Sequence, residues 1–502
     1  MGSVREVTTE AGEFEPAEFA RQFQAFVAGI NRLVPPRASP VRDLLVEHFG
    51  EPPDELPVVS ESLESPEHPN LQLALEELTD AHGWRVVGLS LGLRQYGAFS
   101  MGALATDRMA DWGYPSPRPV PVEYANVSVG PDETLACAQL ALYLGRWGGG
   151  EGEGDAEVPV ALMVMAGDER SHFGSRLTVE VLAADRDVAR DLLAVLQQRR
   201  AALNVYRGRT LSFVFTQHGS FNLDFLRLPD VDRSQVILPD ADLDAIEAHT
   251  IGISRHAAAL RASGRHIKRG LLLYGPPGTG KTWCVTYLRT AMPDRTTVVI
   301  NGGPGIHALG QAVALARNLQ PAMVVLEDVD LVAHERTRPG DGTNPLLFQL
   351  LNEMDGLGED ADVVFVLTTN RLELLEPALA MRPGRIDQAV EIKLPDRNCR
   401  LRLFELYLRG IPGGAEALAE APLVEATEGV SAAFIKELVR RAVLLAAADG
   451  ADGASDGAGA AEPPTVEAHH VTQALTALDA ASATLRTLLG AGGSARSIGG
   501  SG

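Results

Sequence analysis

Apolar residues follow two different periods along the first half of the chain. Between about residues 66 and 230, short apolar runs of strand length alternate with stretches in which apolar residues recur every three or four positions. The strand-like runs are 84–89, 120–127, 158–165, 177–182 and 210–215, and the helix-like stretches are 71–78, 133–144 and 187–199. This alternation predicts an α+β or α/β domain over residues 66–232.

A helical segment is expected before this domain, over residues 1–65. Its clearest helix lies between Ser39 and Gly50, because Ser39 is suited to cap the first turn, Pro40 to occupy the first helical position, and Gly50 to follow the last.

The pattern changes from about residue 233, where strand-like runs become continuously apolar. The first of them, 270–274, leads through a glycine-rich loop into a helix over 281–292, and the later runs are 297–300, 323–326, 363–368 and 389–392. Continuous apolar strands separated by helices are typical of a parallel sheet with helices on both faces. We therefore expect an α/β domain over 233–395, an α-helical lid over 396–487 and a disordered tail over 488–502.

The loop between the first strand and its helix has the pattern G-x-x-x-x-G-K-T. It consists of Gly275, Pro276, Pro277, Gly278, Thr279, Gly280, Lys281 and Thr282. In such a loop, backbone N–H groups and the positive end of the helix surround the phosphates of a nucleotide. The lysine reaches the β- and γ-phosphates, and the hydroxyl of Thr282 binds Mg²⁺. The sequence thus predicts a site for ATP and Mg²⁺.

Two further strands end in polar side chains. The run Met323–Leu326 is followed by Glu327 and Asp328, and the run that ends at Thr368 is followed by Thr369 and Asn370. Carboxylates at such a strand end hold the Mg²⁺ shell and polarise the attacking water in P-loop ATPases. By itself the acidic end of a strand could be a solvated surface feature.

These motifs resemble the AAA family, in the group of proteasomal regulatory ATPases, membrane-bound AAA proteases and segregases. The resemblance runs through KRGLLLYGPPGTGKT, LLFQLLNEMDGLGEDADVVFVLTTN and EPALAMRPGRIDQAVEIKLPD, and more loosely through residues 428–434. It implies that Asn370 orients the attacking water and that Arg382 and Arg385 reach the γ-phosphate in a neighbouring copy. It also implies a ring, with a hexamer expected. Residues 355–357 resemble the family's intersubunit signalling turn, although a glycine that ends a helix is an equal explanation.

The chain departs from the family pattern at two places. The family has Asp-Glu at the strand end, whereas this chain has Glu327-Asp328, as in the AAA translocase of the Rieske protein. We assign Mg²⁺ binding to Glu327 and water activation to Asp328, and expect slower hydrolysis from the shorter carboxylate. The family's pore loop carries an aromatic residue, but the segment 301–307 here reads NGGPGIH and could be a plain turn.

Charge and composition bear on the partners and the cellular location expected for this protein. The 502-residue chain has a formal net charge of −22, which argues against a nucleic-acid partner, since such binding relies on Lys and Arg. Its three cysteines form no C-x-x-C pair, and its first residues include no apolar signal segment. We expect a cytoplasmic protein without a membrane span, and abundant Ala, Gly and Arg are typical of a GC-rich bacterial source.

Histidines supply no metal site in this interpretation. His172, His218 and His307 lack partners at ligand spacing, and His469 and His470 are adjacent on an expected helix, where side chains point about 100 degrees apart. No H-E-x-x-H motif of a zinc protease occurs.

The leading hypothesis is an ATP hydrolase that assembles as a ring and remodels protein clients in a chaperone-like way, with the domain before residue 233 binding the client. The alternative is a nucleotide-gated oligomeric switch or scaffold with slow hydrolysis.

Overall fold

The computed structural model describes residues 39–90, 100–106, 117–148, 157–167, 176–215, 221–301, 308–330, 345–358, 361–375, 386–420, 422–451 and 463–480, together with a few residues between 18 and 26. The described chain forms two compact units. The first comprises Met1–Val127 and Thr134–Asn204, and the second Ser128–Glu133 and Val205–Gly502.

The first unit is built on a six-stranded antiparallel sheet in the order β1-β8-β7-β6-β2-β3. Its strands are β1 (Val58–Glu64), β2 (Arg85–Ser90), β3 (Arg118–Val120), β6 (Leu140–Trp147), β7 (Val158–Met165) and β8 (Arg176–Ala183). A separate two-stranded sheet is formed by β4 (Tyr124–Ser128) and β5 (Thr134–Ala138).

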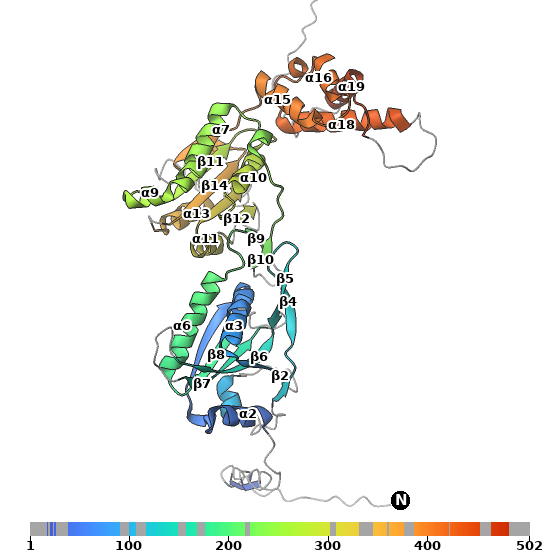
Figure 1. Ribbon diagram of the computed structural model, residues 1–502. Coiled ribbons are helices and arrows are strands. Elements are labelled where there is room, and N and C mark those ends of the chain that lie inside the picture. Colours follow the sequence, from blue (N-terminus) through green and yellow to red (C-terminus); the bar gives the residue numbers. More distant parts are fainter. Residues whose placement is uncertain are drawn as a thin grey trace, which may run out of the picture. The chain divides into compact units, whose positions relative to one another are not determined.

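Helices cover both faces of the six-stranded sheet. One face packs on α3 (His68–His82) and α6 (Arg186–Ala202), and the other on α2 (Pro40–Phe49) and α4 (Met101–Thr106) (Figure 1). The α2 helix begins after Ser39 and ends at Gly50, whose φ of 74° is the left-handed conformation that glycine adopts readily. Both β1 and α2 lie within residues 1–65, so this segment is part of the first unit and is not purely helical.

Two elements of this unit differ from the sequence prediction. Residues 133–144, expected as a helix, form β5 and the start of β6. Nearly all of β6 is buried between two helical layers, so it lacks the alternation that marks a strand with one exposed face. The run 120–127 is two strands because Pro121, which has no N–H to donate, interrupts it.

The second unit contains a seven-stranded sheet in the order β10-β9-β12-β13-β14-β11-β15, parallel except for β10. Its strands are β9 (Thr210–Phe215), β10 (Phe221–Phe225), β11 (Arg269–Tyr274), β12 (Thr296–Asn301), β13 (Ala322–Glu327), β14 (Val363–Thr369) and β15 (Gln388–Glu391). The β9–β10 hairpin joins this sheet because β9 pairs with β12. Residues 205–232 therefore belong to the second unit, whereas the sequence pattern had placed them in the N-terminal domain.

Helices flank this sheet on both faces. The α7 (Asp240–Glu247) and α10 (Lys281–Ala291) helices pack on one face, and α11 (Leu309–Asn318) and α13 (Pro345–Asp355) on the other (Figure 1). The predicted parallel sheet flanked by helices is confirmed.

A lid of helices follows the sheet and has its own apolar core. It comprises α15 (Arg397–Leu408), α16 (Gly414–Glu420), α17 (Leu423–Ala426), α18 (Ala432–Ala451) and α19 (Ala468–Ala480). The lid begins where Asp396 caps α15 by accepting a hydrogen bond from the N–H of Cys399 over 2.7 Å. Within the described residues of both units, no helix has the length and apolar character of a membrane span.

Candidate nucleotide site

The loop from Gly275 to Gly280 connects β11 to α10 and depends on its glycines. Gly275, Gly278 and Gly280 have φ angles of 143°, 75° and 108°. A Cβ at Gly275 would lie 2.2 Å from the carbonyl oxygen of Ile392, so a side chain there would collide with the backbone that follows β15. The glycines thus permit a tight loop whose end coincides with the N-terminus of α10, where unpaired N–H groups attract phosphate.

Lys281 begins α10 and is buried beneath this loop. Its Nζ donates to the carbonyl oxygens of Gly275 and Pro276 over 2.9 and 2.8 Å. Burial lowers the pKa of the Lys281 ammonium group to about 8, and the nearby carboxylates of Asp328 and Asp330 act in the opposite direction.

The two residues expected to bind Mg²⁺ lie together. Thr282 is in the first turn of α10, Glu327 is the last residue of β13, and a side-chain hydrogen bond joins them. Burial raises the pKa of the Glu327 carboxyl group, the bond from Thr282 lowers it, and Asp328 raises it further. A hydroxyl and a carboxylate side by side are oxygen ligands of the kind that Mg²⁺ prefers, so the residues present fit this ion.

Asp328 contacts the polar end of the neighbouring strand instead. Its φ of 50° is left-handed, and its N–H donates to the hydroxyl of Thr368 over 3.0 Å. The Nδ2 group of Asn370 donates to Oδ1 of Asp328 over 3.2 Å. The expected water-activating carboxylate and the expected water-orienting amide are therefore in direct contact.

Asp330 organises the same strand end, a role that sequence reasoning missed. Its buried carboxylate accepts hydrogen bonds from the Thr369 hydroxyl over 2.8 Å and from the N–H of Asn370 over 3.1 Å. The available signal was topological: β13 and β14 are parallel neighbours, so the side chains that follow them meet at one edge of the sheet.

The lid also contacts the phosphate loop. The N–H of Ala433, in the first turn of α18, donates to the carbonyl oxygen of Gly278 over 3.0 Å. A Cβ at Gly278 would lie 2.9 Å from Cβ of Ala433 and 3.0 Å from Oγ of Ser431. Nearby, Trp283 of α10 donates to the carbonyl oxygen of Gln235, and Nζ of Lys436 lies 5.8 Å from the centre of its ring. The sequence pattern had indicated a lid, but not this contact.

Several residues of interest fall outside the described part of the chain. They are Arg382, Arg385, His172, His218 and the loop 302–307. Gly356 is described: it follows the last residue of α13, and its N–H donates to the carbonyl oxygen of Asn352 over 2.9 Å. This geometry is that of a helix end, and the signalling role of 355–357 stays a prediction.

A glycine loop, its lysine, carboxylates at the end of β13 and the amide of Asn370 after the neighbouring parallel strand β14 form the arrangement expected of a P-loop nucleotide site. In agreement, residues 271–394 match the ATPase family associated with various cellular activities (AAA). This part of the chain is therefore an AAA ATPase domain, as the motifs had predicted.

Three relatives illustrate the similarity. The chain is 32% identical over 262 residues to ATP-dependent zinc metalloprotease FtsH 4 of Sphaerobacter thermophilus. The matched region covers 49% of this chain and 39% of that protein. It is 35% identical to the Cell division cycle protein 48 homolog of Archaeoglobus fulgidus, over 38% of this chain and 27% of that protein. It is 36% identical to Proteasome-activating nucleotidase of Methanopyrus kandleri, over 36% of this chain and 43% of that protein. The matched parts thus span less than half of each relative.

Proposed function

We propose that this protein hydrolyses ATP to ADP and phosphate at the loop 275–282, with Mg²⁺ as cofactor. The observation that carries the proposal is the convergence of two polar pairs at one sheet edge, Thr282 with Glu327 and Asn370 with Asp328. Both pairs lie beside a loop whose backbone can surround phosphates.

Each residue has a distinct role in this proposal. Lys281 exchanges its two carbonyl acceptors for β- and γ-phosphate oxygens, and Thr282 and Glu327 hold Mg²⁺, which neutralises charge that develops on the phosphates. Asp328 accepts a proton from the attacking water, and Asn370 orients that water through its amide. The contact of Asp328 with Asn370 supports its assignment as the base over Glu327, which is engaged with Thr282.

We further propose that copies of the chain assemble as a ring, with a hexamer expected, and that Arg382 and Arg385 complete the site of a neighbouring copy. A guanidinium from another subunit stabilises charge on the transferred phosphoryl group. The sequence motif around these arginines supports this assembly, and so does the similarity to a nucleotidase that activates the proteasome.

The work proposed for this ring is the remodelling or disassembly of protein clients, with the first unit as the client-binding part. The relatives' names describe a protease and a proteasome activator, and both act on proteins. Since the sequence contains no H-E-x-x-H motif, we propose no zinc-protease activity for these residues.

One observation favours a second function, a nucleotide-gated oligomeric switch. Asp328 is one methylene shorter than the glutamate usual at its position, and its Oδ1 is already bonded to Asn370. A site of this kind could hold ATP for long periods and use it to set the assembly state.

Steady-state ATP turnover and mass measurement in solution separate the two functions. A client is first captured by cross-linking to a hydrolysis-deficient variant. If the protein is a remodeller, adding this client to the wild type should accelerate ATP turnover. A switch should change its oligomeric state between ATP and ADP without such acceleration. Absence of ATP hydrolysis under both conditions, with K281A behaving like the wild type, would contradict the proposed enzyme.

A further inference from the structure

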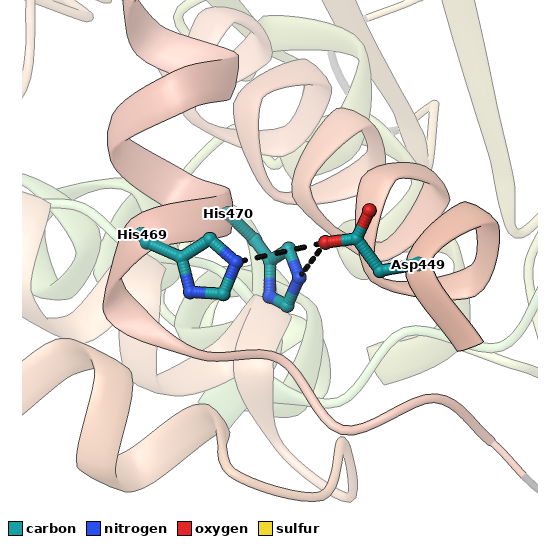
Figure 2. Close-up of side chains that lie close together, drawn as sticks. All are labelled: Asp449, His469 and His470. Atoms are coloured by element: carbon teal, nitrogen blue, oxygen red, sulfur yellow. Dashed lines mark hydrogen bonds and ion pairs between the residues drawn. The ribbon is translucent and has the colours of Figure 1, made fainter. Parts of the chain in front are cut away.

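A second cluster of potential ligands lies in the lid, away from the phosphate loop. Asp449 is in the last turn of α18, and His469 and His470 are in the first turn of α19. Their ligand atoms lie within 4.8 Å of one another, and Figure 2 shows both imidazole rings directed at the carboxylate of Asp449. Among the described residues, this is the group of three His, Cys, Asp or Glu side chains whose ligand atoms lie close enough to hold one metal ion.

The distances within the cluster suit a tetrahedral metal ion. Oδ2 of Asp449 lies 3.0 Å from Nε2 of His470 and 3.6 Å from Nε2 of His469. Ligand bonds to Zn²⁺ of about 2.0 to 2.2 Å place neighbouring tetrahedral ligands roughly 3.3 to 3.5 Å apart. Both measured separations from Asp449 are therefore within about 0.3 Å of this range.

The structure corrects the expectation that the side chains of these adjacent histidines point too far apart to meet. Their ring centres lie only 3.8 Å apart, with a tilt of 41° between the planes. Backbone positions one residue apart do diverge by about 100 degrees. The Cα–Cβ and Cβ–Cγ bonds nevertheless turn both rings toward α18, which the sequence pattern did not indicate.

The surroundings favour a cation between these side chains. Asp449 lies at the C-terminal end of α18, where the helix dipole is negative and a carboxylate is unfavourable without a positive partner. Oε2 of Glu467 lies 3.3 Å from Nδ1 of His469, and a carboxylate behind a ligating imidazole fixes its orientation. His470 is buried, whereas Asp449 and His469 are exposed, so an ion can enter from solvent.

The hydrogen bonds of His470 show which proton and which contacts a metal ion at its ring would replace. Its Nδ1 accepts from the N–H of Glu467 over 3.0 Å, so the neutral ring carries its proton on Nε2 and donates it to Asp449. A metal ion at Nε2 takes the place of this proton, which moves to Nδ1, and the N–H of Glu467 then bonds to water. The ring stays neutral, and both of these hydrogen bonds, at Nδ1 and at Nε2, are exchanged for the metal bond.

We propose that Asp449, His469 and His470 form a binding site for a divalent transition-metal ion of the Zn²⁺ type, which joins the end of α18 to the start of α19. Water supplies the fourth ligand, because the cluster offers three. The opposite end of α18 contacts the phosphate loop through Ala433, so the ion stabilises the lid helix that touches the nucleotide site. This site is independent of whether the chain hydrolyses ATP.

Calorimetric titration of the full chain with Zn²⁺, in excess Mg²⁺ to saturate the phosphate-loop site, tests the proposal. We expect one Zn²⁺ per chain. H469Q and D449N should each weaken binding at least about tenfold, because each removes a ligand from the ion. Both residues are exposed, so these variants should fold. H256Q removes an exposed histidine elsewhere in the second unit and serves as the matched control with unchanged binding.

Cobalt provides a readout that a purely structural role would not change. Co²⁺ bound by this cluster should give the intense visible absorption of four-coordinate cobalt, and H469Q should abolish it while circular dichroism stays that of the wild type. No Zn²⁺ binding by the wild type would overturn the proposal. So would Zn²⁺ binding or a cobalt spectrum that H469Q and D449N leave unchanged.

Discussion

Asp328 occupies the position of the proposed water-activating carboxylate, where the sequence departs from the usual family pattern. Its backbone is left-handed, with φ of 50°, a conformation that Asp adopts more readily than most residues with a side chain. The surrounding hydrogen bonds to Thr368 and Asn370 hold this conformation. This conformation places the carboxylate against Asn370, as the proposed role of the pair requires.

The Asp328→Asn substitution should therefore leave ATP bound while lowering turnover by roughly a hundredfold or more, since it removes the proposed base. The amide can still bond to Asn370, so the fold should be unaffected. Nucleotide affinity by calorimetry and turnover by phosphate release measure the two effects. If Glu327→Gln traps ATP while Asp328→Asn turns over normally, the two roles are reversed.

The pKa of Lys281 makes nucleotide affinity depend on pH. In the free protein this pKa is about 8, and bound phosphate raises it, so binding above pH 8 requires the uptake of a proton. Affinity for ATP should be constant below that pH and fall by up to about tenfold per pH unit above it.

Calorimetry in two buffers of different ionisation enthalpy detects this proton. Uptake should approach one proton per ATP above pH 8 and be small near pH 7, where Lys281 is already charged. Equal heats in both buffers at high pH would show that the ammonium group does not change its charge on binding.

At the scale of elements, the phosphate loop and the start of α18 form a joint that depends on Gly278. An added Cβ there would meet Ala433 and Ser431, whereas one at Gly280 has open space within 4 Å. Both glycines have positive φ, so alanine strains the backbone at either position.

The Gly278→Ala substitution should separate the lid from the loop, with Gly280→Ala as a control for strain alone. Hydrogen exchange at the Ala433 amide should accelerate in the first variant, because its bond to the Gly278 carbonyl is lost. Similar protection of Ala433 in both variants would mean that the contact does not hold the lid.

Elements of the second sheet were more predictable than those of the first. The strands β11 to β14 are buried on both faces, and their continuous apolar runs, separated by helices and loop motifs, predict them directly. In the first unit, β6 has the same burial without a motif beside it, so its run resembled a helix. Contacts distant in sequence, such as Asp330 with Thr369 or Asp449 with His470, required the fold.

At the scale of the whole molecule, the proposed ring depends on residues from two copies. Arg385→Ala should lower turnover by about a thousandfold or more while sparing ATP affinity, because the arginine acts on the transition state from a neighbour. Mixing this variant with Lys281→Ala should restore part of the activity, since one partner supplies the arginine and the other the pocket. Full activity of Arg385→Ala alone would remove the main support for the ring.

The β9–β10 hairpin determines where this chain can be divided. Without it, β12 would be an edge strand with unpaired N–H and C=O groups, which pair readily with another chain. A fragment that begins at residue 233 should self-associate through this edge, whereas one that begins at residue 205 keeps the hairpin and should stay dispersed. Light scattering of the two fragments compares them. We therefore expect the hairpin to shield β12 from pairing with another chain.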